Sequence, residues 1–408
     1  MYEIAYLLQA ENLAGHGSGA MAACDRRVCE RYDDPAAIPR RNTPPAARST
    51  AVMTIIESLD DPTLGELSHR LSELANDLDD EGAWPAEGLR LCQHAGVMRW
   101  FVPRRFDGLE WSEADILRGY MQLAAGCLST TFVVTQPHGV IRRLLDTENV
   151  ELRDLVLPML VSGEAFASVG ISQLTTSRRH SARPPMVVRE AGNDIILDGL
   201  CPWVTGGIHA DYVVSGGVLE DGRQALVLIP TDHSSVTFDP PASMVGLTAT
   251  HTGSMRCRQA KIPRRWIIAG PSENVMAGRK GGNTGGLQTS ALALGLAYAA
   301  IDYLAHEANQ RDDLREPLAA LEEEHRAIVQ DMLAMTTGEI TCSNDELRAR
   351  ANMHVLRATQ SALTAAKGTG YLRGHPVGRW CREALFFLVW SCPQPVASAT
   401  LCELAGLA

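Results

Sequence analysis

The stretch Cys201-Pro-Trp-Val-Thr-Gly-Gly207 decides how this chain is interpreted. It follows a predicted hairpin over residues 186–199, in which two short apolar runs flank Ala191-Gly-Asn193. Trp203 places an aromatic ring two residues before the hydroxyl of Thr205, where the strand is expected to end. An indole and a hydroxyl in this order can cover a flat ring and hydrogen-bond to it. The stretch therefore indicates a binding site at the end of a strand.

The sequence around this stretch falls into three regions, which predict an α+β fold. Residues 56–165 carry leucines spaced three and four apart and are predicted to form an N-terminal helical domain. Residues 166–275 contain short apolar runs between turn residues, which predict a middle β-barrel domain. Residues 276–408 are predicted to form a C-terminal four-helix bundle. We interpret residues 1–55 as a disordered extension, or as the result of a start codon placed too early.

The composition is that of an ordinary globular protein and excludes several classes. With 45% hydrophobic and 21% charged residues, the 408-residue chain can bury a substantial core. A net charge of −11 argues against nucleic acid as a partner, because phosphate binding needs clustered cations. The ten cysteines lack the spacing of a zinc site or a disulfide framework. The longest apolar helix candidate, residues 291–305, is too short and too polar to cross a membrane. We expect a cytoplasmic protein without a metal site.

The order helical, β, helical resembles the acyl-CoA dehydrogenase family, and motifs in all three regions agree over residues 56–392. In the β region Trp203 matches the tryptophan that lies against the family's isoalloxazine ring, and Thr205 matches the hydroxyl near its N5 edge. In the last region Arg382-Glu383-Ala384 follows the family's arginine-acid-alanine motif. The resemblance implies FAD as the cofactor. The contacts that it implies from the β region come from Ile171, Ser172, Ser177, Trp203 and Thr205.

Two further motifs in the last region imply contacts between subunits. Arg311 matches an arginine that reaches the FAD of a neighbouring subunit in the family, and a guanidinium suits a diphosphate because it donates in a fork. A solvated arginine at a helix end is the alternative. Gly368 and Gly370 lie in a turn that resembles the family's glycine-rich approach to the adenosine. The resemblance therefore also implies a homodimer or homotetramer.

The resemblance stops at the residue that should carry the chemistry. In the family a carboxylate takes the α proton of the substrate while the β hydride passes to flavin N5. Ser391 stands where that glutamate is expected, and the rarer position at residues 285–287 holds no acid either. Ser391 and His138 are the candidate catalytic residues. A histidine can serve hydroperoxide chemistry in monooxygenases of this fold, although a lone histidine such as His138 is more often a capping or core residue.

The sequence therefore predicts an FAD-dependent oxidoreductase that acts on an acyl group, carried as a CoA or carrier-protein thioester. An electron-transfer protein or a flavin reductase would be its redox partner. Two alternatives stay open. One is a flavin-dependent monooxygenase or hydroxylase on the same fold, and the other is a flavin-binding homologue that has lost catalysis.

Overall fold

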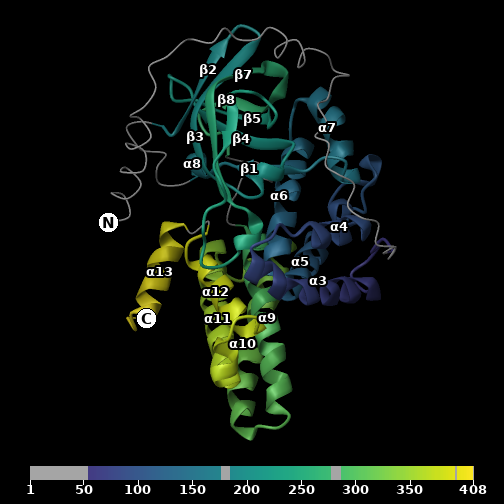
Figure 1. The fold of residues 1–408 in the computed structure, drawn as a ribbon, viewed down its shortest axis with the longest axis vertical. Coiled ribbons are helices and arrows are strands. Elements are labelled where there is room, and N and C mark those ends of the chain that lie inside the picture. Colours follow the sequence, from purple (N-terminus) through teal and green to yellow (C-terminus); the bar gives the residue numbers. More distant parts are fainter. Residues whose placement is uncertain (1–53, 176–183, 277–285, 391–392, 408) are drawn as a thin grey trace. The chain divides into compact units, whose positions relative to one another are not determined.

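A computed structural model describes residues 54–175, 184–276, 286–390 and 393–407. These residues belong to one compact unit, residues 40–408. Within it the chain forms helices, then a sheet, then helices again (Figure 1). The fold class predicted from the sequence is confirmed.

The first helical region contains five α-helices. In the first of these the side chain of Asp61 accepts a hydrogen bond from the backbone N–H of Thr63 at 2.9 Å, and Pro62 occupies the first turn. The helix ends at Gly82, whose φ of 61° lies in the left-handed region that favours glycine. The helices are α3 (Pro62–Glu81), α4 (Ala86–His94), α5 (Glu113–Gly126), α6 (Leu128–Leu145) and α7 (Val150–Ser162).

The sequence predicts a helix break around Gln136-Pro137, and this prediction is wrong. α6 continues through Pro137, and the chain breaks instead at Cys127, which is extended between α5 and α6. Proline removes one backbone donor from a helix. The carbonyl that loses this donor is that of Val133, and the side chains of Thr135 and Gln136 donate to the neighbouring carbonyl of Phe132 at 2.6 and 3.2 Å. α6 is buried along most of its length, so tertiary packing outweighs the local preference of proline.

The β region, predicted to be a small barrel, is a single eight-stranded sheet. Its order is β6-β7-β3-β2-β4-β5-β8, and β1 pairs in parallel with β4. The predicted hairpin around Gly192 is formed by β2 and β3, with Met186 opposite Gly199. The strands are β1 (Ala167–Gly170), β2 (Met186–Ala191), β3 (Asp194–Val204), β4 (Tyr212–Val218), β5 (Gln224–Pro230), β6 (Val236–Phe238), β7 (Gly253–Pro263) and β8 (Ile267–Ser272).

The C-terminal region consists of long helices that extend away from the sheet (Figure 1). α9 packs on α5 of the first region, and buried side chains of both helical regions belong to one hydrophobic cluster. The two helical regions therefore share a core. The helices are α9 (Leu287–Ala308), α10 (Arg315–Thr336), α11 (Asn344–Ala366), α12 (Pro376–Ala384) and α13 (Gln394–Leu404).

We expect Gly295→Ala to destabilise the protein, because α9 approaches α5 closely at this glycine. A Cβ at residue 295 would lie 2.3 Å from the carbonyl oxygen of Met121. The substitution should lower the free energy of unfolding by about 1–3 kcal/mol in urea denaturation followed by circular dichroism. Gly65→Ala is the control, because a Cβ there meets nothing closer than 3.7 Å and helical alanine is favoured over glycine. Equal stability of both variants would contradict the packing.

Candidate functional site

Trp203 lies at an irregularity near the end of β3 and faces outward. Between Cys201 and Val204 the register against β7 shifts, so that β3 has one residue more than its partner, which pairs through Met255 and Gly253. Such a bulge re-aims a side chain and is frequent beside functional sites. The indole is 49% exposed, which is unusual for so large an aromatic group at the end of a sheet strand.

The indole borders a cavity of about 910 Å³. This volume lies in the upper part of the range of roughly 300–1,000 Å³ found for clefts that hold small molecules and cofactors. Residues of the helical region, the sheet and the bundle all contribute to the wall. Four of the sequence-predicted contacts meet there, and these are Ile171, Ser172, Trp203 and Thr205.

Hydroxyl groups form the part of the wall next to the indole. The hydroxyl of Thr205 shares a hydrogen bond with that of Thr252 at 3.0 Å, and Thr252 shares another with Thr250 at 2.8 Å. The hydroxyl of Ser168 on β1 donates to the carbonyl of Thr205 at 2.6 Å and so fixes the end of β3 against β1. Sequence reasoning did not identify Thr250 and Thr252 as site residues. The sequence feature that could have identified them is two threonines, two residues apart, directly before a predicted strand.

Three aromatic rings form an apolar part of the wall. Phe132 on α6 meets Phe386 and Trp390 edge to face, with ring centroids 5.0 and 4.7 Å apart. Phe386 and Trp390 stack at 4.9 Å. All three line the cavity. Phe386 and Trp390 lie in an apolar run at residues 385–390, which is visible in the sequence. The sequence alone does not show that this run contacts α6.

Two carboxylates lie among the described residues that line the cavity. Glu113 begins α5 and Glu339 follows α10, and both side chains are exposed. Gly286 and Leu287 also line the cavity, so the rarer family position for the base lies in the wall and carries no acid. The predicted catalytic Ser391 and the predicted cofactor contact Ser177 lie outside the described residues.

His138, a candidate catalytic residue from the sequence, does not line the cavity. The ring is buried, with Nδ1 bonded to the hydroxyl of Tyr120 and Nε2 3.2 Å from the carbonyl of Val97. Burial lowers the pKa of His138 to about 3, with a further contribution from Arg142. α6 continues through residues 136–139, so His138 lies within a buried helix. His138 is a hydrogen-bonded core residue.

The residues predicted to reach a neighbouring subunit lie close together, away from the cavity lining. Arg311 donates a hydrogen bond to the carbonyl of Ala365 at 2.7 Å. Ala365 lies at the end of α11, directly before the segment that holds Gly368 and Gly370. A Cβ at Gly370 would lie 2.6 Å from that of Ala366, so this position has no room for a side chain. A Cβ at Gly368 would meet nothing within 4 Å. Their role toward a cofactor stays a prediction.

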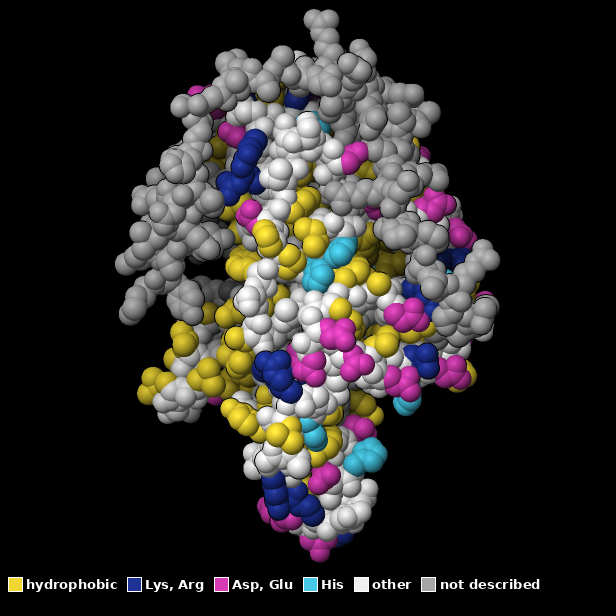
Figure 2. Space-filling model, viewed as in Figure 1, with side chains coloured by type: hydrophobic (Ala, Val, Ile, Leu, Met, Phe, Trp, Pro, Cys, Tyr) yellow, Lys and Arg dark blue, Asp and Glu magenta, His cyan; other side chains and the backbone are white. Residues whose placement is uncertain are grey.

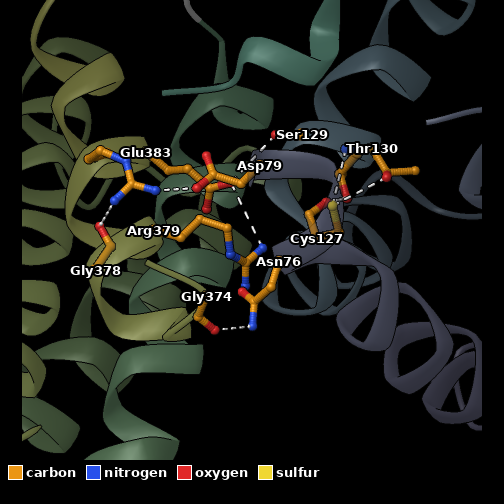
Figure 3. Close-up of polar contacts among 11 residues, drawn as sticks. Asn76, Asp79, Cys127, Ser129, Thr130, Gly374, Gly378, Arg379 and Glu383 are labelled. Atoms are coloured by element: carbon orange, nitrogen blue, oxygen red, sulfur yellow. Dashed lines mark hydrogen bonds and ion pairs between the residues drawn. The ribbon is translucent and has the colours of Figure 1, made fainter. Parts of the chain in front are cut away.

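A buried polar cluster lies where α12 meets α3 and α6 (Figure 3). Glu383 is 1% exposed, accepts a hydrogen bond from Ser129 at 3.4 Å and lies 3.9 Å from Arg379. Asp79 pairs with Arg382 beside it. Desolvation raises the pKa of the Glu383 carboxyl to about 7, although Arg379 opposes the shift. Glu383 lies three residues before Phe386 in the chain and does not line the cavity.

The described ranges hold neither a cluster of metal ligands nor a membrane-spanning helix. No three His, Cys, Asp or Glu side chains gather there as metal ligands would. None of the helices in those ranges combines the length and apolarity that a bilayer span requires.

The fold is that of solved acyl-CoA dehydrogenases, and curated proteins of that family resemble the chain in sequence. No protein-family model matches the chain. Among curated proteins it resembles the probable acyl-CoA dehydrogenase YngJ of Bacillus subtilis (strain 168), with 20% identity over 76% of this chain and 87% of that protein. It also resembles the mitochondrial isobutyryl-CoA dehydrogenase of Bos taurus, with 24% identity over 75% and 78%. These homologues confirm the resemblance to the acyl-CoA dehydrogenase family.

Solved structures agree on the fold. Butyryl-CoA dehydrogenase from Megasphaera elsdenii superimposes with a TM-score of 0.72 at 16% identity, over 84% of this chain and 97% of that one. A glutaryl-CoA dehydrogenase from Mycobacterium smegmatis in complex with FADH2 gives 0.72 at 16%, over 85% and 95%. FkbI, from the biosynthesis of a methoxymalonyl extender unit, gives 0.71 at 18%, over 85% and 99%.

We expect the stability of the protein to depend on pH through Glu383. Because the folded-state pKa of about 7 lies above the ordinary value of 4.5, stability falls as pH rises between these values. Glu383→Gln cannot ionise and lacks this loss. Relative to the wild type, its free energy of unfolding should therefore rise by roughly 3 kcal/mol between pH 4 and pH 8, measured by urea denaturation.

The control is Glu66→Gln, which changes an exposed glutamate on α3. This variant should follow the wild-type curve across the same pH range. A wild-type-like pH dependence of the Glu383→Gln variant would show that folding does not raise the pKa of Glu383.

Proposed function

We propose that this protein is an FAD-dependent oxidoreductase that acts on an acyl thioester. The observation that carries the proposal is the half-exposed Trp203 on the rim of a cavity between sheet and helices, next to the hydroxyl of Thr205. A large indole left exposed beside a cavity of this size suits a flat, ring-shaped ligand. The relatives supply the identity of that ligand, since one structural neighbour is a complex with FADH2.

The residues of the wall fit a flavin and an acyl chain. Trp203 would cover one face of the isoalloxazine, and the connected hydroxyls of Thr205 and Thr252 would hydrogen-bond at its edge. The aromatic group of Phe132, Phe386 and Trp390 offers an apolar surface that binds an acyl chain and excludes water. The flavin, when bound, supplies the two-electron acceptor.

The proton acceptor is the unusual part of this site. Removal of an α proton needs a positioned base, and its loss costs about 10²–10⁴-fold in rate. Ser391 occupies the sequence position of the family glutamate, and a serine hydroxyl is too weak a base without a partner. The carboxylates of Glu113 and Glu339 border the cavity and are the chain's own alternatives. The substrate would reach the site as a CoA or carrier-protein thioester.

The replacement of the glutamate by Ser391 favours a second candidate, a flavin-dependent monooxygenase or hydroxylase on the same fold. Such an enzyme needs no base at that position, but it needs reduced flavin from a reductase partner and oxygen. The third hypothesis is a homologue that binds flavin but has no catalytic activity. The dehydrogenase-type enzyme would instead pass its electrons to an electron-transfer protein.

We also propose that the protein forms a homodimer or homotetramer. Hydrophobic side chains gather over α13 on the face shown in Figure 2, where Leu401 and Leu404 are 66% and 57% exposed. Apolar patches of this kind mark contacts with other proteins. On the same face, lysines and arginines lie interspersed with acidic residues. The mass measured by light scattering distinguishes a dimer or tetramer from a monomer.

We expect the purified protein to be yellow and to release FAD on heating. Trp203→Leu should weaken FAD binding about two- to tenfold, because ring stacking contributes roughly 0.5–1.5 kcal/mol. The matched control is Trp380→Leu, which changes a half-buried tryptophan outside the cavity lining and should leave FAD binding unchanged. Fluorescence titration of the flavin-free protein with FAD measures both. A colourless protein that takes up no FAD would end the proposal.

We expect anaerobic addition of saturated acyl-CoA compounds to bleach the wild-type flavin slowly or not at all. Ser391→Glu restores a carboxylate at the family position and should increase the bleaching rate by about 10²–10⁴-fold. Fast bleaching of the wild type would show that another residue serves as the base. Product formation from reduced flavin and oxygen, without bleaching, would favour the monooxygenase.

A further inference from the structure

α6 presents one continuous face to the cavity, and this face becomes cationic toward its C-terminal end. The cavity-lining positions recur every three or four residues, as expected for one side of a helix. The neutral residues come first and the two arginines last. The face consists of Phe132, Thr135, Gln136, Gly139, Arg142 and Arg143.

The side chain of Arg143 is buried, yet it borders the cavity. It is 7% exposed, and its Nη1 donates to the carbonyl of Gly139 at 2.7 Å. Its Nε has no hydrogen-bond partner within the described part of the protein and no contact with solvent. Burial lowers the pKa of Arg143 to about 10, and the charge of Arg142 adds to the shift, so the guanidinium stays charged at neutral pH.

The absence of a side chain at Gly139 makes room for this arrangement. A Cβ at that position would lie 3.1 Å from Cγ2 of Val169 on β1 and 3.4 Å from Nη1 of Arg143. α6 can therefore lie close to β1 while the guanidinium folds back along the helix. The charged group is thus held next to β1, where Val169 and Ile171 also line the cavity.

Neither arginine of this wall has a carboxylate partner in direct contact within the described residues, although Glu113 and Glu339 line the same cavity. Arg142 is half-buried over the ring of Phe101, with 5.4 Å between its guanidinium carbon and the ring centroid. No ion pair within 4.0 Å joins either arginine to a carboxylate in these parts of the chain. Asp146 acts on Arg143 only from a greater distance and does not line the cavity. Burying a charge without a partner costs several kcal/mol, which a negatively charged ligand would offset.

We propose that Arg142 and Arg143 form an anion-binding subsite in the cavity wall, which holds an oxyanion of the bound ligand. Guanidinium groups bind carboxylates and phosphates through paired N–H donors, and the side chains of Arg142 and Arg143 both border the cavity. The oxyanion has two sources, an acidic group at the far end of the substrate's acyl chain or a phosphate of the cofactor. The inference deepens the proposed function, because the subsite belongs to the same cavity.

Calorimetric titration with two thioesters of equal chain length tests the substrate as the source. Pentanoyl-CoA and glutaryl-CoA differ in the terminal carboxylate, and the wild type should bind glutaryl-CoA about tenfold more tightly or better. Arg143→Met should remove this preference, and Arg143→Lys should restore part of it. Arg104→Met, at a side chain that is 79% exposed, is the matched control and should keep the preference.

Titration of the flavin-free protein with FAD and riboflavin tests the cofactor as the source, since riboflavin lacks the phosphates. In that case Arg143→Met weakens FAD binding but not riboflavin binding, and the thioester preference is unchanged or absent. The subsite is overturned if Arg142→Met and Arg143→Met, both folded by circular dichroism, bind all four probes as the wild type does. A wild type that binds neither flavin contradicts the proposed function, whereas the thioester comparison still decides the subsite.

Discussion

The cavity depends on the close approach of α6 to β1. Gly139 allows this approach, because a Cβ there would lie only 3.1 Å from Val169. On its other side β1 is fixed to the end of β3 by the hydrogen bond from Ser168 to the carbonyl of Thr205. α6, β1 and the end of β3 therefore form one continuous wall, and the bulge before Val204 turns Trp203 toward the cavity.

The bundle closes the site with aromatic rings, and a buried polar cluster stands behind them. Phe386 and Trp390 meet Phe132 across the junction of the two helical regions. One turn earlier on each element, Glu383 and Ser129 make the polar contact between the same helices. A polar contact in a dry junction is directional, whereas apolar packing is not, so this pair helps to fix how α12 lies against α6.

The buried ionisable groups near the cavity are stabilised in different ways. His138 stays neutral and is bonded to Tyr120 and Val97. Glu383 has its pKa raised to about 7 because it is desolvated, although Arg379 is near. Arg143 Nε and Glu383 Oε2 both lack a hydrogen-bond partner among the described residues, but only the side chain of Arg143 borders the cavity.

The sequence by itself determined the types and order of the elements, because periodicity, caps and turn residues act over a few positions. The cap at Asp61, the hairpin around Gly192 and the exposed aromatic at Trp203 all follow from such local signals. Only the tertiary structure decided that α6 runs through Pro137, because burial of a whole helix outweighs a local preference. It also decided which side chains share the cavity wall. Phe132 and Trp390 lie far apart in the chain, and long-range packing alone brings their rings together.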